Sequence, residues 1–365
     1  MKPNRCTALA TAVLTALLAV SSPAAAAESV VPRGFAPAST SWTAPDTGYV
    51  LGYAPCAKSW CPTLLATGDG GRHWRRLGAP PISLPDNHNH VALTFVDDRV
   101  AYVDDGVHVL NTRDGGKTWH SLILVGAKEP FYLSKIAETG GHVFAMISSY
   151  GGKGATRLYA GKAGAPILAP LAGFAATGGL TYGDLAVGGG VQVALGADYG
   201  TEKYWTSQDG VRFTPAPPPC PEGEVASLSG VRESQVVALC SSSPGTPQPG
   251  STERHLWTAP KLGGKFTGTD EAPLLGITQS FSAASPTSAA VATEGGGTGF
   301  LHSTFDGGYT WSTTVLSDRG FSLADLDFPG HGTGVVVDGV PDASSGSAVY
   351  RTTDGGVSWH ELVFG

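Results

Sequence analysis

The stretch Thr112-Arg-Asp-Gly-Gly-Lys-Thr-Trp119 decides the fold, because close copies of it recur along the chain at a nearly regular interval. The other copies are Thr67-Gly-Asp-Gly-Gly-Arg-His-Trp74, Ser207-Gln-Asp-Gly-Val-Arg-Phe213, Thr304-Phe-Asp-Gly-Gly-Tyr-Thr-Trp311 and Thr352-Thr-Asp-Gly-Gly-Val-Ser-Trp359. Their aspartates lie 45, 95, 97 and 48 residues apart, so the middle intervals are close to double the outer ones. The spacing predicts seven units of about 45–49 residues, of which two have lost the pattern.

A period of this size is typical of a β-propeller, in which every unit is one small sheet. The 51 glycines and 26 prolines are typical of many short strands joined by turns. We therefore predict an all-β fold, a seven-bladed β-propeller of four-stranded antiparallel blades, formed by residues 28–365 as a single domain. Besides unit 2, the predicted units span roughly 37–80, 131–170, 178–216, 224–270, 276–316 and 320–363.

Unit 2 shows the expected strands, named A to D from the propeller axis outward. Short apolar runs bounded by turn residues predict strands over 91–95, 99–103, 107–111 and 118–124. The decayed copies of the pattern lie at 159–164 in unit 3 and 257–266 in unit 5. The final unit contains four strands of its own, so the ring need not close by exchanging an outer strand. We expect residues 29–33 to add an edge strand near the C-terminus.

The N-terminal 27 residues have the features of a secretory signal peptide. Lys2 and Arg5 precede an apolar run from Ala8 to Val20, and small residues end at Ala27. The run of 13 apolar residues is too short to span a bilayer, and no later apolar run approaches the roughly 18 residues that a span needs. We therefore expect a secreted protein without a membrane span.

The charge balance of the mature chain argues against a nucleic-acid partner. Without Lys2 and Arg5, 21 basic residues face 30 acidic ones. Nucleic-acid binding requires clustered basic charge, which this composition does not supply.

Four cysteines follow the signal peptide: Cys56, Cys61, Cys220 and Cys240. An even number in an exported protein indicates two disulfides. Cys56 and Cys61 both fall in the B–C loop of unit 1, while Cys220 and Cys240 both belong to unit 5, so we predict these two pairs. A four-cysteine zinc site is the alternative, although the spacings lack paired two-residue knuckles.

The repeated pattern is expected to form the turn between strands C and D. The aspartate can accept hydrogen bonds from turn N–H groups, the glycines allow positive φ and close approach, and the aromatic residue packs between sheets. We expect these residues to be structural: Asp69, Trp74, Asp114, Trp119, Asp209, Phe213, Asp306, Trp311, Asp354 and Trp359. Calcium binding is the alternative, but one carboxylate per turn is too few for a good site.

This pattern resembles the Asp box, or BNR repeat. The repeat is found in sialidases, sortilin-type receptors, xyloglucan-degrading hydrolases and a photosystem II assembly factor family. The resemblance covers five units by motif and seven by period. It implies the propeller fold and leaves the function open, because those families do different things.

The opposite face, formed by the B–C loops and the D-to-A connections, carries the candidate ligand-binding residues. We call it the top face. Aromatic rings beside charged groups suit a sugar or peptide ligand. The candidates are Trp60, His88, His90, Tyr132, Tyr150, Arg157, Tyr199, Glu202, Arg254 and Arg319. The alternative for each is a solvated loop residue.

His88 and His90 alternate on an extended segment, so a metal is conceivable there, but no third ligand can be identified. We therefore expect no metal and no cofactor.

An enzyme of the sialidase class needs three arginines, a tyrosine–glutamate pair and an acidic residue. Three arginines can reach the top face, Arg157, Arg254 and Arg319, but nothing in the sequence marks them as the arginine triad of that class. Tyr199 with Glu202 can imitate the tyrosine–glutamate pair. We expect a secreted, monomeric, non-catalytic module that binds a glycan, an envelope component or a protein. A sialidase-like glycoside hydrolase with a divergent centre is the alternative.

Overall fold

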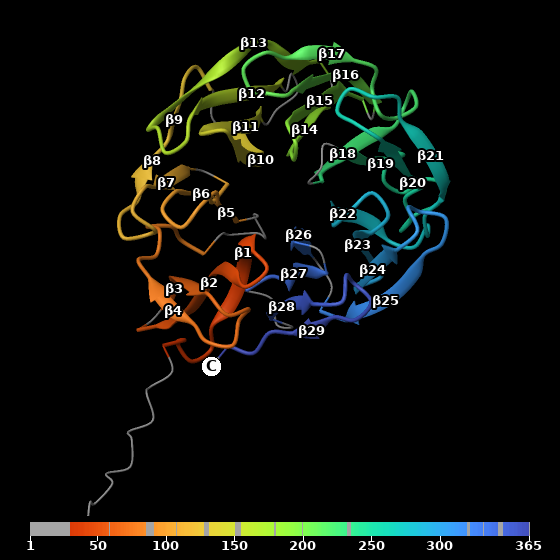
Figure 1. Ribbon diagram of the computed structural model, residues 1–365. Helices are drawn as coiled ribbons and strands as arrows, with labels where there is room; N and C mark the ends of the chain where they lie inside the picture. The colour runs from red at the N-terminus through yellow and green to blue at the C-terminus, as the bar shows by residue number, and fades with distance from the viewer. Residues whose placement is uncertain are drawn as a thin grey trace, which may run out of the picture.

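The computed structural model describes residues 30–57, 59–84, 91–106, 108–127, 131–149, 155–178, 180–198, 200–231, 235–319, 322–330, 332–341 and 346–364. These residues form strands and no helix. The strands make seven antiparallel sheets arranged around a common axis, which confirms the predicted seven-bladed propeller (Figure 1).

Each blade follows the chain in order from strand A at the axis to strand D at the circumference. Blade 1 contains β1 (Ala36–Ala44), β2 (Thr47–Cys56), β3 (Ser59–Thr67) and β4 (Arg75–Leu77). Blade 2 contains β5 (Ala92–Phe95), β6 (Ala101–Asp104), β7 (Val109–Thr112) and β8 (His120–Ser121). Blade 3 contains β10 (Phe131–Thr139), β11 (His142–Ser149), β12 (Ala155–Lys162) and β13 (Ile167–Thr177), with β9 (Ile123–Leu124) outside them.

The remaining blades repeat this order. Blade 4 contains β14 (Thr181–Val187), β15 (Val191–Ala197), β16 (Gly200–Ser207) and β17 (Thr214–Ala216). Blade 5 contains β18 (Val225–Gly230), β19 (Val236–Ser241), β20 (Arg254–Ala259) and β21 (Thr267–Glu271). Blade 6 contains β22 (Ile277–Ala283), β23 (Ala289–Gly295), β24 (Thr298–Thr304) and β25 (Ser312–Ser317). Blade 7 contains β26 (Leu323–Gly330), β27 (Thr333–Gly339), β28 (Ser347–Thr352) and β29 (His360–Glu361).

Two expected strands differ from the structure. The single strand predicted over 118–124 is divided, because β8 pairs in blade 2 whereas β9 pairs in parallel with β13 of blade 3. Residues 30–35 form no strand, so the extra edge strand is absent from the described part of residues 29–33. Phe35 nevertheless packs against Phe364, with ring centroids 5.1 Å apart, so the two ends of the domain do meet.

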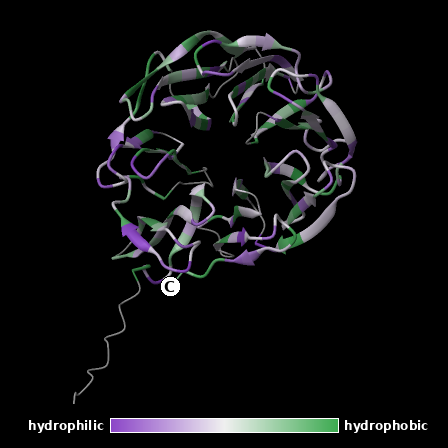
Figure 2. Ribbon diagram, viewed as in Figure 1, coloured by the Kyte–Doolittle hydropathy of each residue, from purple (hydrophilic) through white to green (hydrophobic). Residues whose placement is uncertain are grey.

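The core lies in the middle strands and between neighbouring blades. Strands β15 and β27 are buried along almost their whole length, as expected for strands covered on both faces. Between blades 1 and 2, the rings of Tyr49 and Phe95 stack with centroids 3.5 Å apart. Figure 2 shows hydrophilic residues at the circumference, for example along β4 and β8.

The second glycine of the repeated turn lies directly against the preceding blade. A Cβ atom on Gly308 would be 2.4 Å from Thr269 Oγ1 and 3.1 Å from Leu256 Cβ, both in blade 5. The equivalent atom on Gly71 would be 3.1 Å from Leu362 of blade 7. Both glycines also have positive φ, 98° and 89°. The glycine is therefore required by backbone conformation and by the distance between blades.

Replacing Gly308 by alanine is expected to destabilise the domain by about 3 kcal/mol, from the positive φ and from overpacking against blade 5. The matched control is Gly296→Ala in the same blade, where φ is 62° but no atom lies within 4 Å. That variant should lose only about 1 kcal/mol. Denaturant unfolding measures both. Equal losses would show that contact with blade 5 does not constrain the turn.

Candidate functional site

The seven A strands enclose an axial channel with a cavity of about 570 Å³. Every blade contributes to its lining. The charged residues on its wall are Lys135, Glu138, Asp184, Asp325 and Asp327. Among the described residues that line the cavity there is no arginine, histidine, cysteine or tyrosine.

Hydrogen bonds from the A strands to the preceding blades hold the channel wall together at most junctions. Leu93 N of blade 2 donates to Ser39 Oγ of blade 1 at 2.8 Å, and Ala283 N of blade 6 donates to Ser229 Oγ of blade 5 at 2.9 Å. Among the described residues, six of the seven junctions contain such a bond from a backbone N–H to a side chain; the other four donors are Thr40, Leu133, Leu228 and Leu326.

The remaining junction, between blades 3 and 4, contains an ion pair. Lys135 Nζ lies 3.0 Å from Asp184 Oδ1 and also donates to Leu228 O of blade 5 at 3.1 Å. Asp184 Oδ2 accepts from Leu228 N at 2.6 Å. These two side chains therefore connect three blades, which gives them a structural role on the channel wall.

Asp325 joins the last blade to the first. Its Oδ2 accepts from Thr40 N at 2.8 Å and from Ser39 Oγ at 2.5 Å. Since Ser39 Oγ also accepts from Leu93 N, the contact extends from blade 7 through blade 1 to blade 2. The backbone of Asp325 has φ 53°, a conformation that aspartate tolerates better than most residues.

Asp327 is a channel carboxylate with a raised pKa. Its side chain is exposed to the cavity, but blades surround it on all sides. Desolvation raises the pKa of its carboxyl to about 6, with Lys135 opposing the shift and Asp325 adding to it. A second cavity of about 400 Å³, at the bottom face where the repeated turns lie, also contacts Asp327.

The top face presents Trp60 on a short hairpin closed by a disulfide. Cys56 and Cys61 are bonded, and so are Cys220 and Cys240, which confirms the predicted pairing. Trp60 is 37% exposed and pairs with Pro55 across the β2–β3 ladder. The disulfide and the ladder fix the hairpin on both sides of this exposed indole.

The other top-face candidates do not form one cluster. Arg157 and Glu202 are exposed on blades 3 and 4, and Tyr132 is half-buried at the start of β10. The remaining four positions, His88, His90, Tyr150 and Tyr199, lie outside the described residues.

Two predicted ligand-binding arginines are engaged inside the fold instead. Arg254 is completely buried, because its side chain enters the junction between blades 5 and 6. Arg319 donates to the Tyr350 hydroxyl at 2.8 Å and pairs with Glu361 at 3.2 Å in blade 7. The expectation that both reach a top-face ligand is corrected for Arg254, which has no exposed surface.

The five turn aspartates share one arrangement. Asp114 Oδ1 accepts from Thr118 N at 2.9 Å and from Thr112 Oγ1 at 2.9 Å, and its Oδ2 accepts from Thr118 Oγ1 at 2.7 Å. These donors hold the pKa of Asp114 well below its usual range. In the turn of blade 1, His73 stands at the position that Thr118 has in blade 2, and its Nδ1 lies 2.6 Å from Asp69 Oδ2.

The aromatic residues of the turns pack next to the glycines. Trp119 Nε1 donates to Gly78 O of blade 1 at 2.9 Å, whereas Trp311 and Trp359 donate to the second glycine of their own turns. Trp74 and Phe213 make ring contacts with Phe364 and Phe144. Asp209, Asp306 and Asp354 each accept from turn N–H groups, as Asp114 does.

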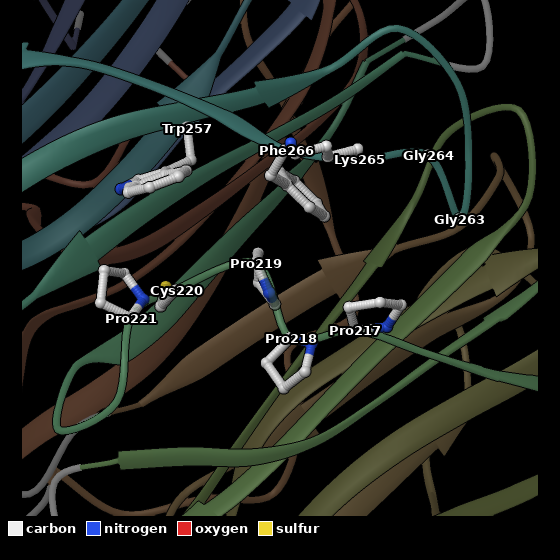
Figure 3. A pocket seen from close by; sticks show the side chains of 10 residues that line it. All are labelled: Pro217, Pro218, Pro219, Cys220, Pro221, Trp257, Gly263, Gly264, Lys265 and Phe266. Carbon is white, nitrogen blue, oxygen red and sulfur yellow. The ribbon is translucent and has the colours of Figure 1, made fainter.

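A pocket that the sequence did not reveal lies between blades 4 and 5 (Figure 3). Its volume is about 350 Å³, and the rings of Trp257, Phe266 and the run Pro217–Pro219 face it. Pro221 and Cys220 close one side. The proline run gives no sign of this neighbour in the sequence, because Trp257 is about 40 residues further along the chain.

In the described part of the chain, no group of three or more histidine, cysteine, aspartate or glutamate side chains is placed to hold a metal ion. No described helix is long and apolar enough to cross a membrane.

No protein-family model matches the chain, and no curated sequence is significantly similar to it. Solved structures do match. YCF48 from Cyanidioschyzon merolae has a TM-score of 0.53 at 16% identity, covering 90% of this chain and 99% of that one. YCF48 bound to a D1 peptide has a TM-score of 0.51 at 16% identity, covering 89% and 94%.

An ulvan lyase of polysaccharide lyase family PL25, bound to the -[GlcA(1-4)Rha3S]- oligosaccharide, has a TM-score of 0.54. It is 10% identical and covers 87% of this chain and 92% of that one. At such identities the likeness shows the propeller fold, which binding proteins and enzymes share.

Asp325→Ala is expected to lower the free energy of unfolding by about 2–3 kcal/mol, because it removes two hydrogen bonds to a carboxylate where the ring closes. Ser280→Ala is the control. That serine accepts one longer bond of 3.3 Å from Leu326 N at the preceding junction, so the loss should stay below about 1 kcal/mol. Urea unfolding compares the two variants. Similar losses in the free energy of unfolding would contradict a special role for the junction between blades 7 and 1.

Asp327→Asn is expected to stabilise the protein at pH 8 and to have little effect at pH 4. The pKa of Asp327 is raised in the folded state from 3.8 to about 6, so the folded protein binds the proton more tightly than the unfolded chain does. Stability is therefore lost as pH rises from about 4 through 6, and the amide avoids this loss. We expect a gain of about 1 kcal/mol at pH 8, since water in the channel screens the charge. Urea unfolding of both proteins at the two pH values tests the sign; a variant that is less stable at pH 8 contradicts it.

Proposed function

We propose that this protein is a secreted Asp-box propeller that binds a ligand on its top face without catalysing a reaction. Residues 1–27 act as the signal peptide, and the mature domain begins near residue 28. The ligand is a glycan, a cell-envelope component or a protein. Two disulfides support an oxidising compartment, where such bonds persist.

The observation that carries the proposal is the presentation of Trp60. Trp60 is a large aromatic side chain that is 37% exposed on the face opposite the repeated turns. Here the Cys56–Cys61 disulfide and the β2–β3 ladder hold it on the surface, so binding costs little ordering of the loop. A large rigid ring with a polar N–H suits stacking on a sugar ring or contact with a peptide.

Three of the five charged channel residues support a binding role over a catalytic one. Lys135 and Asp184 pair with each other, and Asp325 bonds to Ser39 and Thr40. A catalytic acid or base must be available to the substrate, whereas these groups hold neighbouring blades together. These polar side chains face the channel because they join neighbouring blades there.

The geometry of the turns supports the Asp-box assignment. In the repeated turns, the aspartate accepts from N–H and hydroxyl groups of the same turn, as Asp306 does from Thr310 and Thr304. Each second glycine lies against the preceding blade. The repeat therefore acts as a brace at the bottom face, which leaves the top face for recognition.

The comparisons support the two ligand classes. One propeller of this fold is seen with a peptide and another with an acidic oligosaccharide. Our proposal extends the general capacity of the fold to this chain and takes no residue or ligand from those proteins.

The sialidase-like alternative requires three arginines that converge on one carboxylate. Arg157, Arg254 and Arg319 belong to blades 3, 5 and 7, and none lines the axial cavity. Their separation favours the binding role. A fluorogenic sialoside assay on the mature protein is expected to show no turnover, and turnover above that of a boiled sample would overturn the non-catalytic proposal.

Trp60→Ala is expected to weaken ligand binding by about tenfold or more, because it removes the exposed ring from a rigid hairpin. Tyr309→Ala is the matched control, since this aromatic residue is 64% exposed on a turn at the bottom face. A glycan array and a pull-down from the envelope fraction identify the ligand, and titration then compares the variants. Equal affinity of the two variants would place the site elsewhere, and a ligand lost only with Tyr309→Ala would place it on the bottom face.

A further inference from the structure

Arg254 is a buried arginine whose charge has no protein partner in the described structure. Its side chain is 0% exposed. Nη2 donates to Gly276 O at 2.5 Å and to Leu274 O at 3.4 Å, and both acceptors belong to the connection from blade 5 to blade 6. Nε and Nη1 are buried and make no hydrogen bond to any described atom.

Among the residues that the structure describes, no acid compensates this charge. Burial alone lowers the pKa of Arg254 to about 10, and no carboxylate raises it. His302 of blade 6 lies close enough to interact electrostatically with the guanidinium. Burial first, and the charge of Arg254 to a smaller extent, lower the pKa of His302 to about 4, so its imidazole is neutral at physiological pH.

Two hydroxyl groups next to Arg254 also lack partners. Ser241 is the ladder partner of Arg254 across β19 and β20, so both side chains leave the same face of the sheet. Thr252 precedes Arg254 by two residues, and its N–H donates to Leu274 O, which also accepts from Arg254. Ser241 Oγ and Thr252 Oγ1 are buried without a hydrogen-bond partner among the described atoms.

These groups have one chemistry in common. Nε–H and Nη1–H are donors only, and the two hydroxyls can each donate as well. A buried charge that lacks a counter-charge is strongly unfavourable, and a neutral guest would satisfy the hydrogen bonds but leave the charge unpaired. An anion satisfies both needs, and a halide is a small spherical anion that accepts several hydrogen bonds at once.

We propose that Arg254, Ser241 and Thr252 bind one small halide ion, such as chloride, in the junction between blades 5 and 6. The ion completes the hydrogen bonds of the guanidinium and cancels its charge. It thereby stabilises the attachment of residues 242–253, which form the B–C loop of blade 5, to the connection that follows β21. That attachment also includes the bond from Gly276 N to Gly250 O.

The site makes stability depend on halide concentration. Chloride added to protein in gluconate buffer at constant ionic strength is expected to raise Tm with saturation, by on the order of 2 °C at a tenfold excess over Kd. Arg254→Met should abolish the saturable part of the shift. Arg157→Met is the matched control, because Arg157 occupies strand C of blade 3 but is exposed, and it should keep the full shift.

A second measurement remains decisive if Arg254→Met fails to fold. Crystals of the unaltered protein grown in bromide are expected to show an anomalous peak within hydrogen-bond distance of Arg254 Nε and Nη1. A peak there supports the proposal. Density for water alone at that position, or a Tm that does not change between gluconate and chloride, overturns it.

Discussion

The propeller depends on contacts by which each blade binds the next at the axis. At six of the seven junctions among the described residues, strand A of one blade donates a backbone N–H to a side chain of the blade before it, as Leu93 does to Ser39, and an ion pair serves the seventh. A ring of separate sheets has as many junctions as blades, and one weak junction opens it. Asp325 secures the junction at which the chain ends meet, so closure needs no strand exchanged between the first and last blades.

This constraint supports the proposed location of ligand binding on the top face. Lys135, Asp184 and Asp325, which face the channel, are occupied with holding neighbouring blades. The repeated turns occupy the bottom face for a similar reason, since their glycines must approach the preceding blade. The top face contains neither the channel side chains that join the blades nor the repeated turns. Its loops vary most in length and composition between blades, and Trp60 is presented there.

The period of the turn motif was sufficient to predict seven blades and their approximate limits, because the same local hydrogen bonds recur in each turn. The disulfides followed from placing each cysteine pair within one blade. The junction residues could not be predicted. Lys135, Asp184 and Asp325 carry no local signature, and their partners lie in other blades, up to 286 residues away in sequence. The burial of Arg254 was not predicted either, because the residues that cover it are distant in sequence. A charged residue that follows a polar loop is ordinarily expected to be exposed.

The two blades that lost the turn motif show how its contribution is replaced. In blade 3, strand D is β13, and β9 of the preceding segment pairs along its outer edge, so Ile123 and Ile167 become ladder neighbours. In blade 5, the Cys220–Cys240 disulfide ties the incoming connection to strand B, and a loop of that size contributes about 3 kcal/mol. Each substitute attaches its blade to the chain segment before it, as the turn glycines do elsewhere. A blade can therefore lose the turn motif when another contact attaches it to the preceding segment of the chain.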